Sequence, residues 1–176
     1  SQMFTPSYRW LFKPVATHYV EFFQHPNNLN PLRSSLIVSV FNTLLSITLG
    51  ITAAYSLSRF SFKGKGLFGM LVLVLRMIPP VSIALPLFLV ARRLGLYDTH
   101  LILILSTMIF TLPFTVWMMK GFFDSLPREI EESALIDGCS RLGVLLRIVI
   151  PLSMTGIAVT SVFCWFYSWN EFLYPL

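Results

Sequence analysis

Charged residues are scarce in this chain of 176 residues, where Asp, Glu, Lys and Arg together make up only 12%. Soluble globular domains carry about 25% charged residues, so half that share argues against water and for lipid as the solvent. The hydrophobic share of 55% and the mean hydropathy of +0.72 point the same way. The net charge of +5 is modest, and it indicates membrane orientation rather than a nucleic-acid partner.

The residues that carry catalytic or metal chemistry are also few. Two cysteines, Cys139 and Cys164, build neither a disulfide framework nor a metal-binding spacing. The chain has no phosphate-binding G-x-x-x-x-G-K-[ST] motif, because "KGKG" at 63–66 lacks its spacing, and it has no G-x-S-x-G nucleophile motif. Metal-ligand spacing is missing around the three histidines, His18, His25 and His100. The sequence therefore predicts a non-enzymatic chain without catalytic, cofactor-binding or metal residues.

Long apolar runs dominate what is present. Residues 36–58 hold no charge over 23 positions, enough for a helix to cross a hydrocarbon core of about 30 Å. Three further apolar runs contain prolines. The first of them also contains Arg76, the second has Pro113, where a kink is expected, and the third opens at Pro151. The predicted spans are residues 36–58, 67–91, 101–119 and 148–169. We expect an all-α, polytopic transmembrane helical bundle forming one domain over 1–176, with 1–34 as an extracytoplasmic connecting segment.

Basic residues near the span ends indicate the orientation. Seven of them fall in two connections on the same side: Arg59, Lys63, Lys65, Lys120, Arg128, Arg141 and Arg147. The opposite side has Arg33, Arg92 and Arg93 close to a span, and the pair Arg92–Arg93 counts against this orientation. The excess of Lys and Arg on cytoplasmic loops predicts a multi-pass inner (plasma) membrane protein whose loop 120–147 is cytoplasmic.

The polar stretch "REIEESALIDGCSRL" at 128–142 interrupts these apolar runs. Pro127 suits the first turn of a helix, Ser125 is expected to cap it, and the glutamates that follow suit the positive end of the helix dipole. Ile130 and Ala134 share one face at i, i+4. Gly138 is expected to adopt a left-handed conformation at the helix end.

A second short helix is expected at 141–150, capped by Ser140. A first helix of about ten residues is marginal in water, so it needs a packing partner. One alternative is a solvated connector. A DNA-reading helix–turn–helix is the other, but four acids against three basic residues at 128–147 make a poor surface for phosphates, and no nucleic-acid partner is expected.

The same stretch resembles the EAA loop of ABC importer permeases. "EESALIDG" followed by "RIVIPLS" matches the family pattern of Glu-Ala-Ala, two residues, Asp-Gly and a later proline. The matching positions are Glu132, Ala134, Asp137, Gly138 and Pro151. Ser133 and Cys139 replace small residues of the pattern. The flanks "AAYSLSRFSFKGKG", "LGLYDTH", "FFDSLPREIEESALIDG" and "WNEFLYPL" are similar to the carbohydrate-type permeases of the maltose-importer (MalG-like) class.

This resemblance implies a MetI-like, type I importer fold and a non-catalytic transport subunit. The first loop helix would be a coupling helix in a groove of a cytoplasmic ABC ATPase dimer, which binds the ATP and Mg²⁺. Glu132, Ser133 and Ala134 would contact that partner, Gly138 would shape the turn, and Asp137 would hold it by bonding backbone N–H groups. Further implied partners are a second, MalF-like permease subunit, an extracytoplasmic solute-binding protein, a sugar substrate and membrane lipid. Because the family usually has six spans, we expect a fragment.

Intramembrane polar groups are candidates for the substrate pathway, since they are costly in lipid. The candidates are Asn42, Arg76, Trp169, Asn170 and Glu171. Arg76 stands beside Pro79–Pro80, where broken helix backbone suits a cavity, but a snorkelling arginine is the alternative. Trp169 can stack on a sugar or belong to an interfacial aromatic belt. Alternative functions are uptake of a non-sugar solute such as a glycerol-phosphate-like compound, a secondary transporter, or an intramembrane enzyme.

Overall fold

The computed structural model describes residues 26–171, and side chains from residue 29 onward. The chain divides into two compact units, Ser1–Ser34 and Ser35–Leu176. Of the first unit only the helical residues 26–34 are described, so the packing below is that of 35–171. The predictions for His18, His25 and most of segment 1–34 lie outside the described residues.

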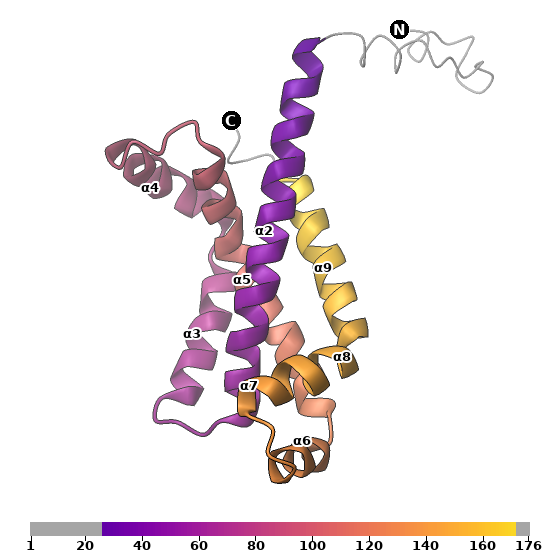
Figure 1. Cartoon of the computed structure of the whole chain (residues 1–176). Helices are drawn as coiled ribbons and strands as arrows, with labels where there is room; N and C mark the ends of the chain where they lie inside the picture. The colour runs from indigo at the N-terminus through magenta and orange to yellow at the C-terminus, as the bar shows by residue number, and fades with distance from the viewer. Residues whose placement is uncertain (1–25, 172–176) are drawn as a thin grey trace, which may run out of the picture. The chain divides into compact units, whose positions relative to one another are not determined.

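Every regular element in the described part is helical, as the sequence predicts (Figure 1). The elements in chain order are α2 (Pro26–Arg59), α3 (Lys65–Met77), α4 (Pro80–Arg93), α5 (His100–Ser125), α6 (Arg128–Ile136), α7 (Arg141–Val144), the π-helical turn η3 (Leu145–Val149), α8 (Ile150–Leu152) and α9 (Met154–Trp169).

Two unbroken helices are long and apolar enough to cross a bilayer by themselves: α5, and α2 over Leu29–Arg59. Both extend beyond the predicted runs. Residues 26–34, expected in a connecting segment, are helical, and α5 continues through residues 120–125 of the predicted loop. Pro113 lies inside α5 without ending it.

The predicted span 67–91 is divided into α3 and α4, which are bent by 96° at the break. The residue before a proline is pushed out of the helical region, and here two prolines follow one another. Ile78 and Pro79 accordingly have extended backbone, with ψ of 125° and 131°. Neither helix alone is long enough to cross about 30 Å of hydrocarbon, but the pair together has the length and hydropathy of one bent span.

The predicted span 148–169 is divided as well. The helical run Arg141–Leu152 and α9 are bent by 78° around Ser153. Pro151 has no N–H for the carbonyl four residues earlier, and the turn before it is the π-helical η3, so α-helical bonding is irregular on this side of the bend. Residues 148–152 therefore belong to the helix that leads out of the polar loop, and α9 begins at Met154.

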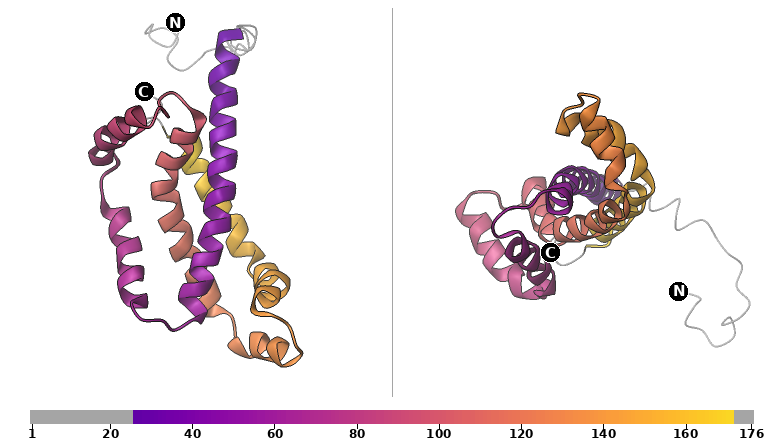
Figure 2. Two further views of the ribbon diagram at one scale, coloured as in Figure 1. Left: turned by 60° about the vertical axis from the view of Figure 1, so that its left-hand side comes forward. Right: turned by 90° about the horizontal axis from the view of Figure 1, so that it is seen from below.

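Helix α5 packs against both α3 and α9, while α2 lies along α5 (Figure 2). Small residues allow these close approaches, as is usual for helices in membranes. Gly50 of α2 faces Thr115 of α5, and Gly156 of α9 faces the ring of Phe122.

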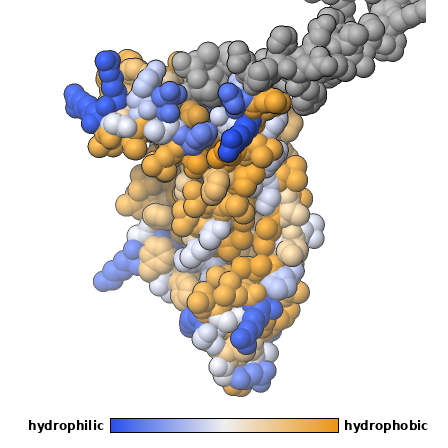
Figure 3. All heavy atoms as spheres, turned by 45° about the horizontal axis from the view of Figure 1, so that its top comes forward, coloured by the Kyte–Doolittle hydropathy of each residue, from blue (hydrophilic) through white to orange (hydrophobic). Residues whose placement is uncertain are grey.

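Large apolar side chains remain exposed along the helices, including Leu44 at 58%, Met70 at 64%, Val81 at 70% and Val162 at 67%. Hydrophobic side chains cover much of the face drawn in Figure 3, with hydrophilic ones gathered toward its margins. Such a surface suits lipid or neighbouring apolar helices.

Candidate functional site

Helix α6 starts differently from the sequence prediction. It begins at Arg128 after Pro127, which acts as N-cap without a side-chain hydrogen bond. The Ser125 hydroxyl donates instead to the carbonyl of Phe122, 2.7 Å away, inside α5. The predicted cap by Ser125 is therefore wrong, because α5 continues to that residue. The acidic first turn, with Glu129 and Glu131, is present as expected.

The end of α6 is closed by backbone hydrogen bonds around Gly138. This glycine has φ of 89°, which confirms the predicted left-handed conformation. The N–H of Cys139 donates to the Ala134 carbonyl at 3.0 Å, and the N–H of Gly138 donates to the Leu135 carbonyl at 3.2 Å. This pair of bonds is the Schellman motif, which satisfies the last carbonyls of a helix.

The backbone bonds of this motif replace the predicted role of Asp137. Its carboxylate is exposed and has no hydrogen bond within residues 26–171, so the turn does not depend on it. The second predicted cap is confirmed, since the Ser140 hydroxyl accepts from the Gly143 N–H at 3.1 Å.

Two faces of α6 have opposite environments. One face carries Glu131 and Ala134, which are 7% and 8% exposed. The other is open, and we define it as the exposed face of α6: Glu129, Glu132, Ser133, Ile136 and Asp137. Of the five predicted coupling residues, Glu132, Ser133, Asp137 and Gly138 are exposed, whereas Ala134 is turned into the chain's own core. Ile130, predicted to share a face with Ala134, is 43% exposed.

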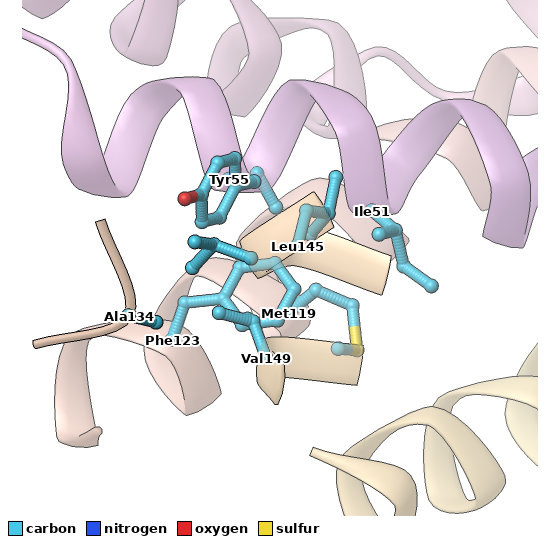
Figure 4. Close-up of a cluster of buried hydrophobic side chains, with 9 residues drawn as sticks. Ile51, Tyr55, Met119, Phe123, Ala134, Leu145 and Val149 are labelled. Atoms are coloured by element: carbon cyan, nitrogen blue, oxygen red, sulfur yellow. The ribbon is translucent and has the colours of Figure 1, made fainter. Parts of the chain in front are cut away.

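Ala134 belongs to a buried cluster that joins the loop helices to the bundle. The cluster contains Ile51, Ala54, Tyr55, Met119, Phe123, Ala134, Val144, Leu145 and Val149. Figure 4 shows side chains from α2, α5, α6 and η3 facing one another in it. The short side chain of Ala134 lets α6 pack closely against this cluster, so the small residue serves internal packing.

A buried ion pair holds the same face of α6. The side chains of Arg59 and Glu131 are 6% and 9% exposed, and Arg59 Nη2 lies 2.6 Å from Glu131 Oε1. Arg59 Nε also donates to Oε1 at 2.6 Å, and the Tyr55 hydroxyl donates to Oε2 at 3.1 Å. Sequence reasoning assigned Glu131 only to the helix dipole. Its i, i+3 spacing to Ala134 places both on one face, but the link to Arg59, 72 residues away, required the tertiary structure.

The helical connections around this pair are tied together as well. Arg59 Nη2 donates to the Leu126 carbonyl between α5 and α6, and Arg128 Nη2 donates to the Ser58 carbonyl, both at 3.3 Å. The guanidinium carbon of Arg141 lies 5.1 Å above the Phe60 ring. The base of α2 is thereby attached to both loop helices.

One predicted pathway residue lines an apolar pocket of about 340 Å³, and a second is hydrogen-bonded to a residue of its wall. Arg76 lines it, with its guanidinium carbon 4.7 Å above the Phe114 ring. Asn42 does not line it but is fully buried, and its side-chain oxygen accepts from the Thr111 hydroxyl at 3.0 Å. Thr111 also lines the pocket, together with Phe110, Phe163 and Tyr167. We call this the membrane pocket.

The other three pathway candidates, like Asn42, are not among the described residues that line the membrane pocket. Trp169 stacks on Trp165, with ring centroids 6.0 Å apart and planes at 10°. Asn170 is exposed, and its side-chain amide donates to the Phe166 carbonyl at 2.8 Å. Glu171 is partly buried just beyond α9.

Long apolar helices with a capped polar helix pair at one end define a membrane protein of the all-α class. Residues 46–176 match the family of binding-protein-dependent transport system inner membrane components. The chain belongs to this family, which confirms the resemblance to ABC importer permeases.

The chain is also similar to curated permease proteins. The chain is 37% identical to the inner membrane ABC transporter permease protein YcjP of Escherichia coli (strain K12), over 93% of this chain and 55% of that protein. It is 33% identical to the trehalose/maltose transport system permease protein MalG of Thermococcus litoralis, over 94% and 60% of the two chains. The sulfoquinovosyl glycerol transport system permease protein SmoH of Agrobacterium fabrum is also 33% identical, over 93% and 57%. The chain thus spans about half the length of the curated relatives it matches.

A solved structure has the same fold. It is the crystal structure of a bacterial ABC transporter involved in the import of the acidic polysaccharide alginate. The TM-score is 0.67 at 23% identity, covering 87% of this chain and 53% of that one. The predicted permease fold is therefore confirmed.

Proposed function

We propose that this chain belongs to a membrane permease subunit in an ATP-driven importer of a sugar or oligosaccharide. The observation that carries the proposal is the exposed face of α6. This helix is capped by a Schellman turn and anchored to the bundle on one side, yet it presents polar and acidic side chains on the other. Together with the family match, this arrangement is that of a helix built to receive a partner protein.

The partner we propose is a cytoplasmic ABC ATPase dimer that binds ATP and Mg²⁺. Glu132, Ser133 and Asp137 lie on the exposed face of α6, which is open to a groove of another protein. Gly138 positions this face through its left-handed turn. Ala134 contributes indirectly, because its burial seats the helix. The seven basic residues in the two connections predicted on the same side support a cytoplasmic location of the loop.

The translocation pathway we propose passes the membrane pocket. Its aromatic walls offer flat apolar surfaces to a sugar ring, while Arg76 and the Asn42–Thr111 pair supply polar groups nearby. Trp169, Asn170 and Glu171 would act closer to the end of α9. A second, MalF-like permease subunit would complete the pathway, and an extracytoplasmic binding protein would deliver the solute.

The relatives named for trehalose/maltose and for sulfoquinovosyl glycerol favour a carbohydrate as cargo. Closure of the ATPase would move α6 and rock the helices between inward-open and outward-open states. A glycerol-phosphate-like solute is the alternative cargo. A secondary transporter or an intramembrane enzyme would be an alternative of another class, and either would work without an ATPase.

The test is reconstitution of the full-length permease, its partner permease, the ATPase and the binding protein in lipid vesicles. We expect ATP-dependent uptake of at least one sugar from a panel of neutral sugars, acidic sugars, glycerol phosphate and amino acids. Uptake that persists without the ATPase would refute the proposal. Uptake of only the non-sugar compounds would support the proposed importer function and refute a sugar as its cargo.

The matched test of the coupling face is Glu132→Lys against Lys120→Gln. Glu132 lies on the exposed face of α6, whereas Lys120 lies in α5 in a half-exposed ion pair with Asp124. Reversing the charge at Glu132 is expected to lower co-purification of the ATPase while membrane levels stay normal, and Lys120→Gln is expected to change neither. Equal ATPase recovery with both variants would contradict the docking role.

A further inference from the structure

The end of α2 and the buried face of α6 form one mechanical unit. Glu131 accepts two hydrogen bonds from α2, from Arg59 Nε to Oε1 at 2.6 Å and from the Tyr55 hydroxyl to Oε2 at 3.1 Å, and Arg59 Nη2 lies 2.6 Å from Oε1 in the ion pair. The Tyr55 ring is in turn held edge-on against Phe60 and Phe123, at centroid distances of 6.0 and 6.1 Å. Both oxygens of the carboxylate are thereby satisfied.

Burial makes this contact hard to open. Removing one partner of a buried ion pair leaves a charge without water or counter-ion, which is strongly unfavourable. Within the described residues neither side chain forms a second direct ion pair, although Arg59 Nη1 also donates to the Ser58 hydroxyl, which in turn donates to Asp124. A displacement of α6 therefore carries the base of α2 with it more readily than it separates the two side chains.

Helix α2 extends this connection to the membrane pocket. It is continuous from Arg59 to Asn42, about 25 Å along the axis at 1.5 Å per residue. Asn42 accepts from Thr111, which lines the membrane pocket. Movement at the cytoplasmic end of α2 thus reaches a polar contact at the pocket through a single rigid element.

We infer that the buried Arg59–Glu131 pair, supported by Tyr55, transmits the movement of α6 to α2 and so couples the ATPase to the membrane pocket. This inference rests on the proposed function. It assigns the two neighbouring glutamates different tasks: Glu132 faces the ATPase, while Glu131 faces inward and acts as a positioning residue. It also assigns a physical role to the segment "AAYSLSRF", which supplies Tyr55, Ser58 and Arg59.

The test is a double-mutant cycle in the reconstituted full-length complex with Arg59→Gln, Glu131→Gln and both together. Three quantities are measured: ATPase recovered with the permease, basal ATP hydrolysis, and solute taken up per ATP hydrolysed. Lys63→Gln is the control, since Lys63 is an exposed basic residue before α3 that forms no ion pair within the described residues.

We expect each single variant to retain the ATPase, because the exposed face of α6 is unchanged. Uptake per ATP should fall about tenfold, within the range typical of coupling between sites. The double variant should be no worse than the poorer single variant, because residues that act as a pair are non-additive. The control should match the wild type.

Wild-type uptake per ATP in Glu131→Gln would overturn the inference. So would a double variant whose loss equals the product of the single losses, or an ATPase recovery that falls in parallel with uptake, since the pair would then only hold the fold. If the single variants do not reach wild-type membrane levels, Tyr55→Phe decides, because it removes one hydrogen bond to Glu131 without leaving a buried charge unpaired. A reduced uptake per ATP in Tyr55→Phe supports the inference, and an unchanged value overturns it.

Failure of the proposed function is recognised separately. If the wild-type complex shows no ATP-dependent uptake, the proposed function itself fails before any variant is compared. If the wild type transports and the variants of the double-mutant cycle take up as much solute per ATP as the wild type, only the role of the Arg59–Glu131 pair is refuted.

Discussion

Gly50→Ala is expected to destabilise the bundle although it adds a single methyl group. An ideal Cβ at Gly50 would lie 2.8 Å from Thr115 Cβ and closer still to its Cγ2, whereas ordinary van der Waals contact is 3.4–4 Å. Helices α2 and α5 must then separate by at least 0.6 Å at this crossing. Overpacking of this kind costs about 1–3 kcal/mol, so we expect the free energy of unfolding to fall by that amount.

Gly121→Ala is the matched control, because it lies in α5 and its Cβ would meet nothing within 4 Å. Alanine is favoured over glycine inside a helix by about 1 kcal/mol, so this variant should be neutral or stabilised. The assay is thermal or denaturant unfolding of the full-length permease in detergent.

A second control examines the geometry directly. Thr115→Ser removes Cγ2 and keeps the hydroxyl that donates to the Thr111 carbonyl at 2.8 Å. Added to Gly50→Ala, it should recover part of the lost stability. The reasoning is refuted if Gly50→Ala is as stable as the wild type, or if Thr115→Ser brings no recovery.

Three further predictions concern the loop and its orientation. Gly138→Val places a β-branched residue at φ of 89° and should abolish uptake while membrane levels stay normal. The control Gly95→Val has the same kind of backbone strain at φ of 69° and should leave uptake within about twofold of wild type. Equal loss of uptake in both variants would indicate an effect of strain in general. In a Cys-free full-length protein, Ile136→Cys, 86% exposed, should react with an impermeant thiol reagent only from the cytoplasm, and Tyr97→Cys, 60% exposed, only from outside; the reverse pattern would invert the topology. Ala134→Leu should lower stability by about 1–3 kcal/mol in the same unfolding assay, because the added atoms enter a packed cluster; unchanged stability would show that α6 is not seated there.

The helical class and the polar loop could be predicted from local sequence. An uncharged run such as 36–58 must form a helix in lipid, because its backbone N–H and C=O groups have to be hydrogen-bonded within the segment. The left-handed turn at Gly138 and the N-cap at Ser140 could also be predicted, since each depends on only a few neighbouring residues. The structure has both.

The breaks inside two spans could be anticipated only in part. Pro79–Pro80 and Pro151 marked them in the sequence, but the bends of 96° and 78° depend on which elements the separated helices pack against. Ser125 was misassigned because a proline two residues later resembles a helix start, while packing carries α5 through to Ser125 itself.

The sequence by itself determined a membrane-embedded helical chain with a capped polar loop, because solvent preference and turn chemistry are local. Only the tertiary structure decided which side of that loop faces inward. Neighbouring residues on a helix point in directions about 100° apart, so Glu131 and Glu132 are nearly equivalent in sequence but not in space. One is buried against Arg59 and the other is open, because the end of α2 meets a single face of α6.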